Sequence, residues 1–474
     1  MVDKPGSSSE DSGDDNDNLL PHNYLNGDDG EEEEETQNNT PEERENVMVV
    51  VLGDIGHSPR MNYHALSLAE EGYEVNLIGF SGTKPPLEVL ENDHITLTYM
   101  TPCPKWVYIF PRIISFFLKV FLQSLILFFT LISCTAPSKL LLQNPPAVPA
   151  MPVCWLYCLI VRSKFLIDWH NYGYSIMALS LSPSHLLVKI YKFVEKVFGK
   201  LAHGGLCVTK AMKDDLSKSF GINRIIVHYD RPHSRFHPIS DAEKHNFFLR
   251  MGTEYPCFSS SSPDKTVFTE RFADGRISFY EDRPALIVSS TSWTEDEDFS
   301  ILLYALQDFE RVRSQFKQHY PQLVVVITGK GPLKDYYVQD IQSRNWQHVA
   351  VVTPWLSAED YPKLLASCDL GVCLHFSSSG LDLPMKVVDM FGSGIPVMAI
   401  NYPALPELVQ HNENGLVFST KEELANLLQD WFRGFPKETA VKETYYDFYH
   451  NIAQFRRMKW HPSWTCNVLP LFAE

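Results

Sequence analysis

An apolar block from Ile113 to Ser133 limits most strongly what this chain of 474 residues can fold into. The block has 21 residues with a single charge, Lys119, so its length and composition are sufficient to cross a bilayer. Features that suit a membrane interface precede it, namely Trp106, Tyr108, Pro111 and Arg112. A buried core helix is the alternative, because Lys119 and Gln123 interrupt the apolar run.

Strand patterns on both sides of this block favour a helix that lies in the membrane interface, or dips in and returns. Short apolar runs rich in Val, Leu and Ile are typical of buried parallel strands. They occur before the block at 46–53 and 74–80, and after it at 139–147, 163–171 and 204–212. A single crossing would put these two groups on opposite sides of the membrane, where they could not form one sheet. We therefore expect a membrane-associated helix at about 106–134 that does not span.

The negative charge of the chain is concentrated at its N-terminus. Residues 1–46 contain sixteen Asp and Glu against Lys4 and Arg44, which makes -14 of the formal net charge of -17. Such a segment has too few apolar residues to offset the entropy of ordering, so the sequence predicts a disordered acidic tail over 1–46. The remaining chain carries only -3 and has no basic stripe, so no nucleic-acid partner is expected.

A first Rossmann-like domain is predicted over 47–236. Its first strand leads through a glycine-containing loop into a helix, and such a helix N-terminus is suited to anions. Gly56, His57 and Arg60 are the candidate binding residues of this loop. Gly53 and Gly56 do not form the GxGxxG pattern, so the dinucleotide fingerprint is absent.

The second half of the chain repeats the α/β pattern. Residues 237–280 have few periodic apolar positions and predict a surface insertion or an interdomain linker. A second Rossmann-like domain is expected over 281–432, with helices over 433–474 that return to the first domain. Its predicted strands lie in 284–290, 323–332, 348–356, 368–376 and 412–418. Two parallel sheets of this kind place ligands at the carboxyl ends of their strands and form a central cleft.

The loop "GKG" follows the second of these strands directly. Glycines allow backbone amides to approach a diphosphate, and a lysine between them can neutralise its charge. Gly329, Lys330 and Gly331 are therefore candidate phosphate-binding residues. A lysine that is simply solvated in a glycine turn is the alternative.

The stretch "PMKVVDMFGSGIPV" holds a second candidate. Lys386 and Asp389 are three residues apart on a predicted helix and face the same way, as an ordinary surface ion pair also would. After a strand and a loop that contains Gly380, Lys386 can instead bind phosphate while Asp389 accepts sugar hydroxyls. Glu407 can bind ribose hydroxyls or cap a helix.

Polar side chains in the first domain are candidates for proton transfer. Asp168 and His170 end a predicted strand, and either can act as a general base, although such pairs also orient loops. Asp230 and Arg231, with His233, lie in "HYDRPHSRFHP", which can line the cleft or form a plain connecting loop. No HxxxH or DxD pattern occurs in a suitable place, so no metal site is predicted.

Four longer stretches carry a family resemblance. They are "GDIGHSPRMNYHALSLA", "DWHNYGYS", "SSTSWTEDEDFSILLYAL" and "HFSSSGLDLPMKVVDMFG". Together with "ALPELVQHNENGLVF", they resemble GT-B glycosyltransferases that use a nucleotide sugar, and among these the chitobiosyldiphosphodolichol beta-mannosyltransferase family. The resemblance covers residues 47–460. Many GT-B enzymes carry two acids eight residues apart, but here Asp389 pairs with Leu381, and Asp382 is one residue out of register.

The resemblance implies a function and a place in the cell. It implies transfer of mannose from GDP-mannose, the donor substrate, to dolichol-diphosphate-linked chitobiose, with inversion and a beta-1,4 linkage. It implies no tightly bound cofactor, a location on the cytosolic face of the endoplasmic reticulum membrane, and a complex with other glycosyltransferases of lipid-linked oligosaccharide assembly. Two alternatives stay open: a GT-B enzyme with another donor or acceptor, and an inactive GT-B membrane scaffold.

Within this reaction, the chemistry and position of the candidate residues suggest their roles. The acceptor would contact Gly56, His57, Arg60, Asp230 and Arg231. The donor would contact Gly329, Lys330, Gly331, Gly380, Lys386, Asp389 and Glu407. His170 or Asp168 would act as the base.

Overall fold

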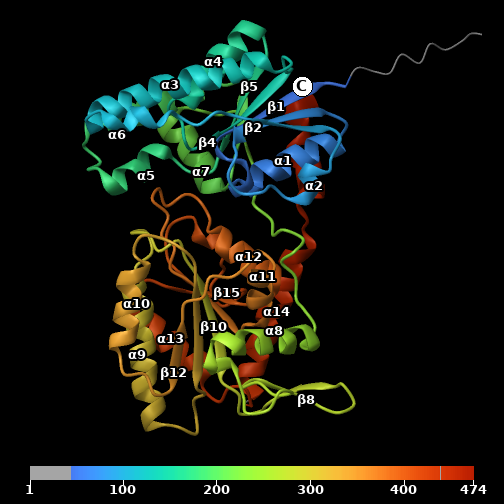
Figure 1. The fold of residues 1–474 in the computed structure, drawn as a ribbon, viewed down its shortest axis with the longest axis vertical. Coiled ribbons are helices and arrows are strands. Elements are labelled where there is room, and N and C mark those ends of the chain that lie inside the picture. The colour runs from blue at the N-terminus through green and yellow to red at the C-terminus, as the bar shows by residue number, and fades with distance from the viewer. Residues whose placement is uncertain (1–43, 438, 474) are drawn as a thin grey trace, which may run out of the picture. The chain divides into compact units, whose positions relative to one another are not determined.

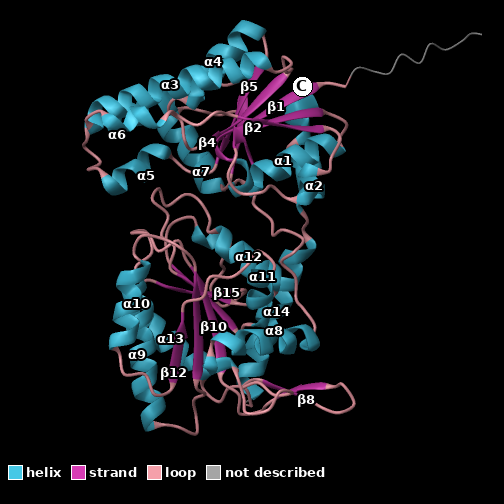
Figure 2. Ribbon diagram, in the orientation of Figure 1, coloured by secondary structure: helices cyan, strands magenta, loops and turns pink. Residues whose placement is uncertain are grey.

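Two parallel sheets organise the computed structural model, which describes residues 44–437 and 439–473 (Figure 1, Figure 2). We call the seven-stranded sheet with its helices the first lobe, and the six-stranded sheet with its helices the second lobe. The predicted disordered tail, 1–46, lies outside the described residues except for 44–46. Its boundary needs a small correction, since strand β1 already begins at Asn46.

The first sheet has the order β3-β2-β1-β4-β5-β6-β7, and every neighbouring pair is parallel. Val47 to Val51 of β1 are completely buried, as expected for a strand covered on both faces. Its strands are β1 (Asn46–Asp54), β2 (Glu74–Phe80), β3 (Ile95–Tyr99), β4 (Lys139–Asn144), β5 (Lys164–Trp169), β6 (Gly204–Cys207) and β7 (Ile225–Val227).

Helices cover both faces of the first sheet. One core contains side chains from α3, α4 and α6, and the other contains side chains from α1 and the C-terminal helices. The helices are α1 (Pro59–Glu70), α2 (Leu87–Leu90), α3 (Arg112–Ser133), α4 (Ala150–Val161), α5 (Gly173–Ser180), α6 (Leu186–Leu201) and α7 (Lys210–Asp215).

Helix α3 is the apolar block singled out from the sequence. Residues Ile113–Ser133 form the one helix among the described residues that is long and apolar enough to cross a membrane. Within residues 113–133 of α3, Leu127 and Leu131 are the two fully buried side chains, and most of the other large apolar side chains are exposed. A core helix would bury that surface, so the core-helix alternative does not fit.

The second sheet has the order β12-β11-β10-β13-β14-β15 and is also parallel. One face packs against α9, α10 and α13, the other against α8, α11, α12 and α14. Its strands are β10 (Ala285–Ser290), β11 (Leu323–Thr328), β12 (Val349–Val352), β13 (Leu370–Cys373), β14 (Val397–Ile400) and β15 (Gly415–Phe418). Its helices are α8 (Asp241–Glu254), α9 (Phe299–Gln315), α10 (Lys334–Ser343), α11 (Asp360–Ser367), α12 (Met385–Ser393), α13 (Lys421–Phe432) and α14 (Thr439–Arg457).

Residues 237–280 form regular secondary structure, whereas the sequence predicted a surface insertion or an interdomain linker. Helix α8 starts with a capping box between Ser240 and Glu243, and a small antiparallel pair follows, β8 (Thr269–Arg271) with β9 (Ile277–Phe279). Although the segment has few periodic apolar positions, the rings of four phenylalanines anchor it in the core of the second lobe: Phe247, Phe248, Phe258 and Phe268.

The C-terminal segment connects the two lobes. Helix α14 packs against α12 in the second lobe, and α15 (Trp460–Asn467) packs against α1 in the first. Trp464 and Phe472, the latter in α16 (Leu469–Ala473), are completely buried in the core of the first lobe.

Candidate functional site

The carboxyl ends of the strands of both sheets meet through hydrogen bonds. After β5, the amide of Asn171 donates to Ser378 Oγ at 3.4 Å, and the hydroxyls of Ser175 and Ser378 lie 2.9 Å apart. Thr209 Oγ1, after β6, donates to the backbone carbonyl of Leu381 at 2.5 Å. The loop 374–384 of the second lobe therefore faces the strand ends that hold the predicted base.

Arg60 joins several predicted residues of the first lobe into one buried network. Its Nε and Nη2 donate to both carboxylate oxygens of Asp168, at 2.8 and 3.1 Å. Its Nη1 donates to Asp230 Oδ1 at 2.8 Å and to the backbone carbonyl of His228 at 2.9 Å. Because this guanidinium is buried and already bonded, it is not free to bind an acceptor, which corrects its predicted role.

Asp168 is completely buried and accepts hydrogen bonds from Arg60, His64 and His170. Burial alone would raise the pKa of this carboxyl, but the charge of Arg60 outweighs it and holds the pKa well below its usual range. An acceptor hydroxyl cannot reach it. Asp168 therefore fits the role of a positioning residue, and its prediction as the base is corrected.

His64 belongs to this network and was not predicted. Its Nε2 lies 3.1 Å from Asp168 Oδ2, while Trp464 Nε1 donates to its Nδ1 at 2.8 Å. These partners fit the neutral imidazole with its proton on Nε2, and burial lowers the pKa of His64 accordingly. The indole that holds it comes from a helix 400 positions further along the chain.

His170 is the partner of Asp168 that faces the site. Its Nε2 lies 2.8 Å from Asp168 Oδ2, and its side chain is 23% exposed. A buried carboxylate that accepts from Nε2–H leaves Nδ1 without a proton, as an acceptor. The pair can therefore present a positioned base, with the carboxylate stabilising the imidazolium that forms.

The loop after β1 carries the other predicted acceptor residues. A side chain at Gly56 is excluded, because its Cβ would lie 2.2 Å from the carbonyl oxygen of Thr83. His57 is 75% exposed, and its Nδ1 lies 2.7 Å from Asp54 Oδ2. Gly56 and His57 thus lie at the carboxyl end of the sheet, on an exposed loop.

The polar cluster at 228–238 is only partly buried, since His228 and Arg231 are buried whereas Ser234, Arg235 and His237 are exposed. Asp230 pairs with Arg60, and Arg231 packs over the ring of Phe455 at 5.3 Å. Burial lowers the pKa of Arg231. Neither side chain is open to a ligand, so the plain connecting role fits better than the predicted acceptor contact.

In the second lobe, the loop after β11 presents Lys330 to solvent. Cβ atoms at Gly329 and Gly331 would each lie 1.7 Å from a backbone oxygen, that of Thr291 and Ser292 respectively. The two glycines are therefore required for close approach to the neighbouring loop. Lys330 Nζ lies 3.9 Å from the ring centre of Trp355, which is itself 60% exposed.

Lys386 lies in the first turn of α12 and is not paired with Asp389. Its ammonium contacts Oε1 of Glu297. The other carboxylate oxygen of Glu297, Oε2, accepts hydrogen bonds from Thr291 Oγ1 and from the backbone N–H of Ser292. Glu297 is buried, whereas Lys386 remains partly exposed. The alternative of a surface ion pair with Asp389 is therefore not supported, and a carboxylate that sequence reasoning missed orients the lysine.

Asp389 has an unusual protonation state. Burial raises its pKa to about 8, and nearby Arg235 only partly offsets this. At neutral pH the carboxyl is mostly protonated and can both donate to and accept from a hydroxyl. Gly380, with φ of 73°, forms a left-handed turn in the loop that precedes α12.

His375, two residues after the end of β13, adds a cation that was not predicted. Its Nδ1 lies 3.1 Å from Asp296 Oδ2, and its Nε2 lies 3.8 Å from Asp382 Oδ2. Burial opposes the imidazolium, but these carboxylates outweigh it and raise the pKa of His375 to about 9. The rule that selected His170, a polar residue at the end of a strand, would also have found it.

Glu407 has the helix-capping role that was one of its two predicted alternatives. Its carboxylate accepts from the backbone N–H groups of Lys210 and Ala211, both at 2.8 Å, and from the hydroxyl of Tyr229 at 2.7 Å. Because its oxygens are bonded to the first lobe, binding of ribose is not supported.

The described residues contain no group of three or more His, Cys, Asp or Glu side chains placed to hold a metal ion. The positive groups near the strand ends of the second lobe are instead Lys330, Lys386 and His375. Such cations can stabilise a leaving diphosphate.

The fold and this site define a GT-B glycosyltransferase. A family model described as "Glycosyl transferases group 1" matches residues 277–447. The fold is similar to that of a sucrose-phosphate synthase from Thermosynechococcus elongatus, with a TM-score of 0.61, 13% identity, and coverage of 89% of this chain and 96% of that chain.

Sequence comparison identifies the family. The chain is 48% identical over 436 residues to the human chitobiosyldiphosphodolichol beta-mannosyltransferase, covering 90% of this chain and 93% of the relative. It is 44% identical over 421 residues to an Arabidopsis thaliana protein named UDP-glycosyltransferase TURAN, covering 83% and 90%. The chain belongs to the chitobiosyldiphosphodolichol beta-mannosyltransferase family and is a glycosyltransferase.

Proposed function

We propose that this enzyme transfers mannose from GDP-mannose to dolichol-diphosphate-linked chitobiose, forming a beta-1,4 linkage with inversion. The observation that carries the proposal is the pairing of a positioned base, His170 on Asp168, with a group of cations at the opposing strand ends. The name of the human relative supports a mannosyl transfer to a lipid-linked chitobiose acceptor, and GDP-mannose is the proposed donor.

On the donor side, Lys386 and His375 would contact the diphosphate. Both are partly exposed cations that already face carboxylates of their own lobe, Glu297 and Asp296. A bound diphosphate can replace part of these contacts, since charge-assisted hydrogen bonds to phosphate are strong. Asp389, protonated near neutral pH, would bind a sugar hydroxyl. Lys330 would lie beside the nucleobase or the diphosphate of the donor.

On the acceptor side, His170 Nδ1 would take the proton of the attacking hydroxyl. The bond from that oxygen to the anomeric carbon forms while the bond from the anomeric carbon to the diphosphate oxygen breaks. Attack from the face opposite the leaving group inverts the configuration. The cations of the second lobe stabilise the charge that develops on the diphosphate.

We further propose that the enzyme works on the cytosolic face of the endoplasmic reticulum membrane. Helix α3 lies between β3 and β4 in the chain, yet β1 and β4 are hydrogen-bonded neighbours in one sheet. A single crossing by α3 would separate them, so α3 would lie in the interface and hold the site near the lipid acceptor. Glycosylation sites engineered near Lys84 and Ser180 should both stay unmodified in microsomes.

The test is a transfer assay with purified protein and phytanyl-diphosphate chitobiose. Radiolabelled GDP-mannose should give a trisaccharide product that a beta-mannosidase cleaves. Because one relative is named a UDP-glycosyltransferase, UDP-glucose and UDP-N-acetylglucosamine are tested in parallel. Transfer only from a UDP-sugar would replace the proposed donor, and no transfer from any donor would favour an inactive scaffold.

A further inference from the structure

Helix α6 presents an apolar stripe to solvent. Its buried residues are Val188, Tyr191, Glu195 and Gly199, which face the core of the first lobe. On the opposite side, at helical spacing, Leu186, Ile190 and Phe193 are 68%, 48% and 66% exposed. A surface helix of a soluble domain normally places polar residues there, so the outward stripe requires another apolar environment.

A row of lysines borders this stripe. All four are exposed and follow helical spacing along one edge of the helix: Lys189, Lys192, Lys196 and Lys200. The only acid in α6 is Glu195, which is buried and accepts from Asn144 Nδ2 and the backbone N–H of Gly173. The exposed side of α6 is therefore apolar and positively charged.

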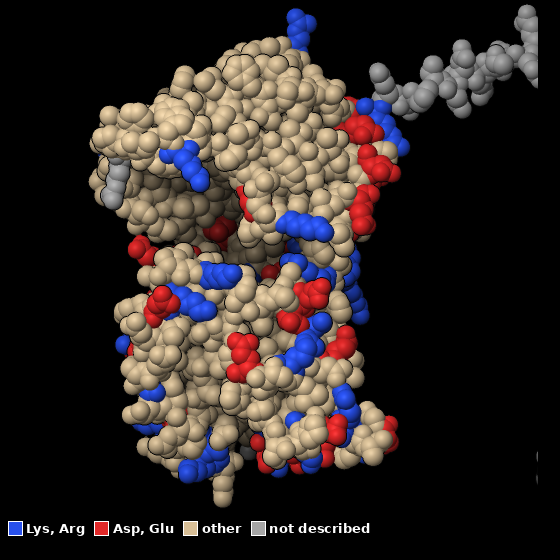
Figure 3. Space-filling view, viewed as in Figure 1, with Lys and Arg blue, Asp and Glu red and all other residues tan. Residues whose placement is uncertain are grey.

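The stripe belongs to a helical layer that includes α3. Helix α4 contacts both α3 and α6, and the rings of Trp155 and Phe198 lie 5.6 Å apart. Leu156, Leu159 and Ile160 of α4 are exposed. Charged side chains are sparse on this part of the surface in Figure 3, in contrast to the second lobe.

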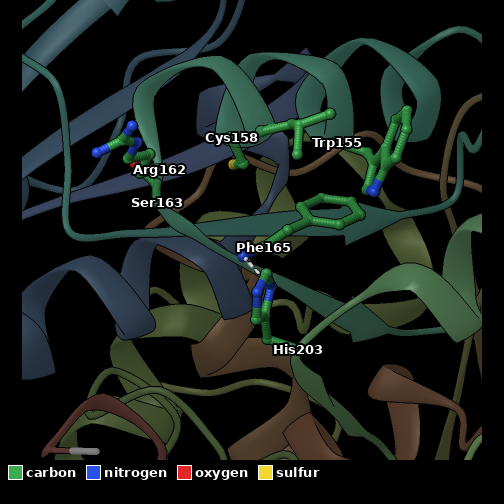
Figure 4. Close-up of a pocket in the computed structure, with 7 residues that line it drawn as sticks. Trp155, Cys158, Arg162, Ser163, Phe165 and His203 are labelled. Carbon is green, nitrogen blue, oxygen red and sulfur yellow. Dashed lines mark hydrogen bonds between the residues drawn. The ribbon is translucent and has the colours of Figure 1, made fainter.

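A cavity of about 200 Å³ opens beside α4. Among the residues that line it, Figure 4 shows the rings of Trp155 and Phe165 close to each other, and Arg162 apart from them with its guanidinium directed away. His203 is held by a hydrogen bond from the backbone N–H of Phe165 to its Nδ1, at 3.0 Å. The layer thus combines apolar surface with further basic groups.

We propose that α6 is a second membrane-contacting helix, which lies on a bilayer surface that contains anionic lipids. Its apolar stripe would enter the boundary between headgroups and acyl chains, and its lysines would contact the headgroups. A protein partner fits less well, because lysine is depleted at protein interfaces. If α3 were the sole membrane contact, the first lobe could rotate about the axis of that helix. Contacts through both α3 and α6 would fix the tilt of the lobe relative to the bilayer. The inference takes its purpose from the proposed function, but lipid binding is measured without turnover.

Flotation of the full-length protein with vesicles tests this inference. One set of vesicles is phosphatidylcholine alone, and the other also contains phosphatidylserine. Lys189→Gln/Lys196→Gln should weaken binding to the anionic vesicles by about fivefold per lysine and leave binding to the neutral vesicles unchanged. Ile190→Ser/Phe193→Ser should weaken binding to both by about tenfold or more.

Matched changes in the second lobe are the controls. Lys317→Gln/Lys421→Gln and Phe316→Ser alter exposed residues of the same kinds and should bind like the wild type. Wild-type binding by both α6 variants would overturn the proposal and leave a protein partner for this face. Equal losses in the controls would also overturn the proposal, since vesicle binding would then depend on the total charge or apolar surface of the protein and not on α6. If the vesicle results hold but no sugar is transferred, only the proposed function fails.

Discussion

The two lobes place their charged side chains differently. In the first lobe, Arg60 and His64 are buried and each bonded to the buried Asp168, and only His170 of the network is open to the site. In the second lobe, Lys330, Lys386 and His375 are all at least partly exposed. The first arrangement fixes the position of the proposed base, while the second leaves cations exposed that a ligand could contact.

This difference explains why some predicted residues cannot have their predicted roles. Buried charges need their partners, since an unpaired charge in a protein interior is costly. Arg60 and Asp168 therefore stabilise the fold and the geometry of the site, although their sequence positions resemble those of ligand-binding residues. Residues of the second lobe can exchange a protein carboxylate for a phosphate at much lower cost.

The largest expected effect concerns the one exposed member of the buried network. His170→Ala should lower kcat by about 10²- to 10⁴-fold, because it removes the proposed general base. Its thermal unfolding should stay close to that of the wild type, since the side chain is partly exposed. A variant with wild-type turnover would show that the base lies elsewhere.

Asp168→Asn tests the buried part of the same network. It leaves Arg60 without its main counter-charge, and breaking a buried pair typically costs about 3 to 5 kcal/mol. Urea titration at pH 7 measures this loss, with the exposed His57→Ala as a control that changes stability by under about 0.5 kcal/mol. Since its folded-state pKa is lowered, the stabilisation from Asp168 is present above pH 4 or so and is lost as the pH falls. A loss under about 1 kcal/mol would contradict the structural role.

Lys386→Ala tests the exposed cations of the second lobe. A charge-assisted contact contributes about 1.5 to 3 kcal/mol, so binding of GDP should weaken about 10- to 150-fold. Lys386→Arg should restore it only partly, because a planar fork replaces a point charge. Calorimetry measures the affinity, with Lys317→Ala as the control. Unchanged affinity would leave Lys386 as only the partner of Glu297.

His375 should make the stability of the second lobe depend on pH. Its pKa is raised from 6.5 to about 9, so its contribution is complete below about pH 6.5 and is lost as the pH rises through 9. The difference in unfolding free energy between the wild type and His375→Gln should therefore shrink over this range. Urea titrations at several pH values measure it, and a difference that does not change with pH would argue against a stabilised imidazolium.

The smallest effect is expected from the acidic tail. Deletion of residues 1–43 should change kcat/KM by less than about threefold, under roughly 1 kcal/mol. The same transfer assay measures it. A hundredfold loss would assign the tail a direct part in substrate binding.

Much of this architecture could be predicted from the sequence, because long apolar strands and the loops after them follow local rules. The short strand β3, "ITLTY", was missed, since it alternates at the edge of its sheet. At the site, the strand ends directed attention to His170 and Lys330, which remain proposed site residues. The contacts of Trp464 with His64 and of Glu297 with Lys386 were not predicted, because they join distant parts of the chain and no local pattern encodes them.

One experiment directly tests whether the first lobe supplies the base and the second lobe binds the donor. Donor affinity and the rate of transfer are measured on the same two variants. Calorimetry of GDP and single-turnover transfer from GDP-mannose are applied to His170→Ala and Lys386→Ala. The account predicts that His170→Ala binds GDP like the wild type but transfers at least a hundredfold more slowly. Lys386→Ala should lose at least tenfold in GDP affinity. A His170→Ala variant that loses GDP affinity, or a Lys386→Ala variant that keeps it, would contradict the separation of base and donor site between the two lobes.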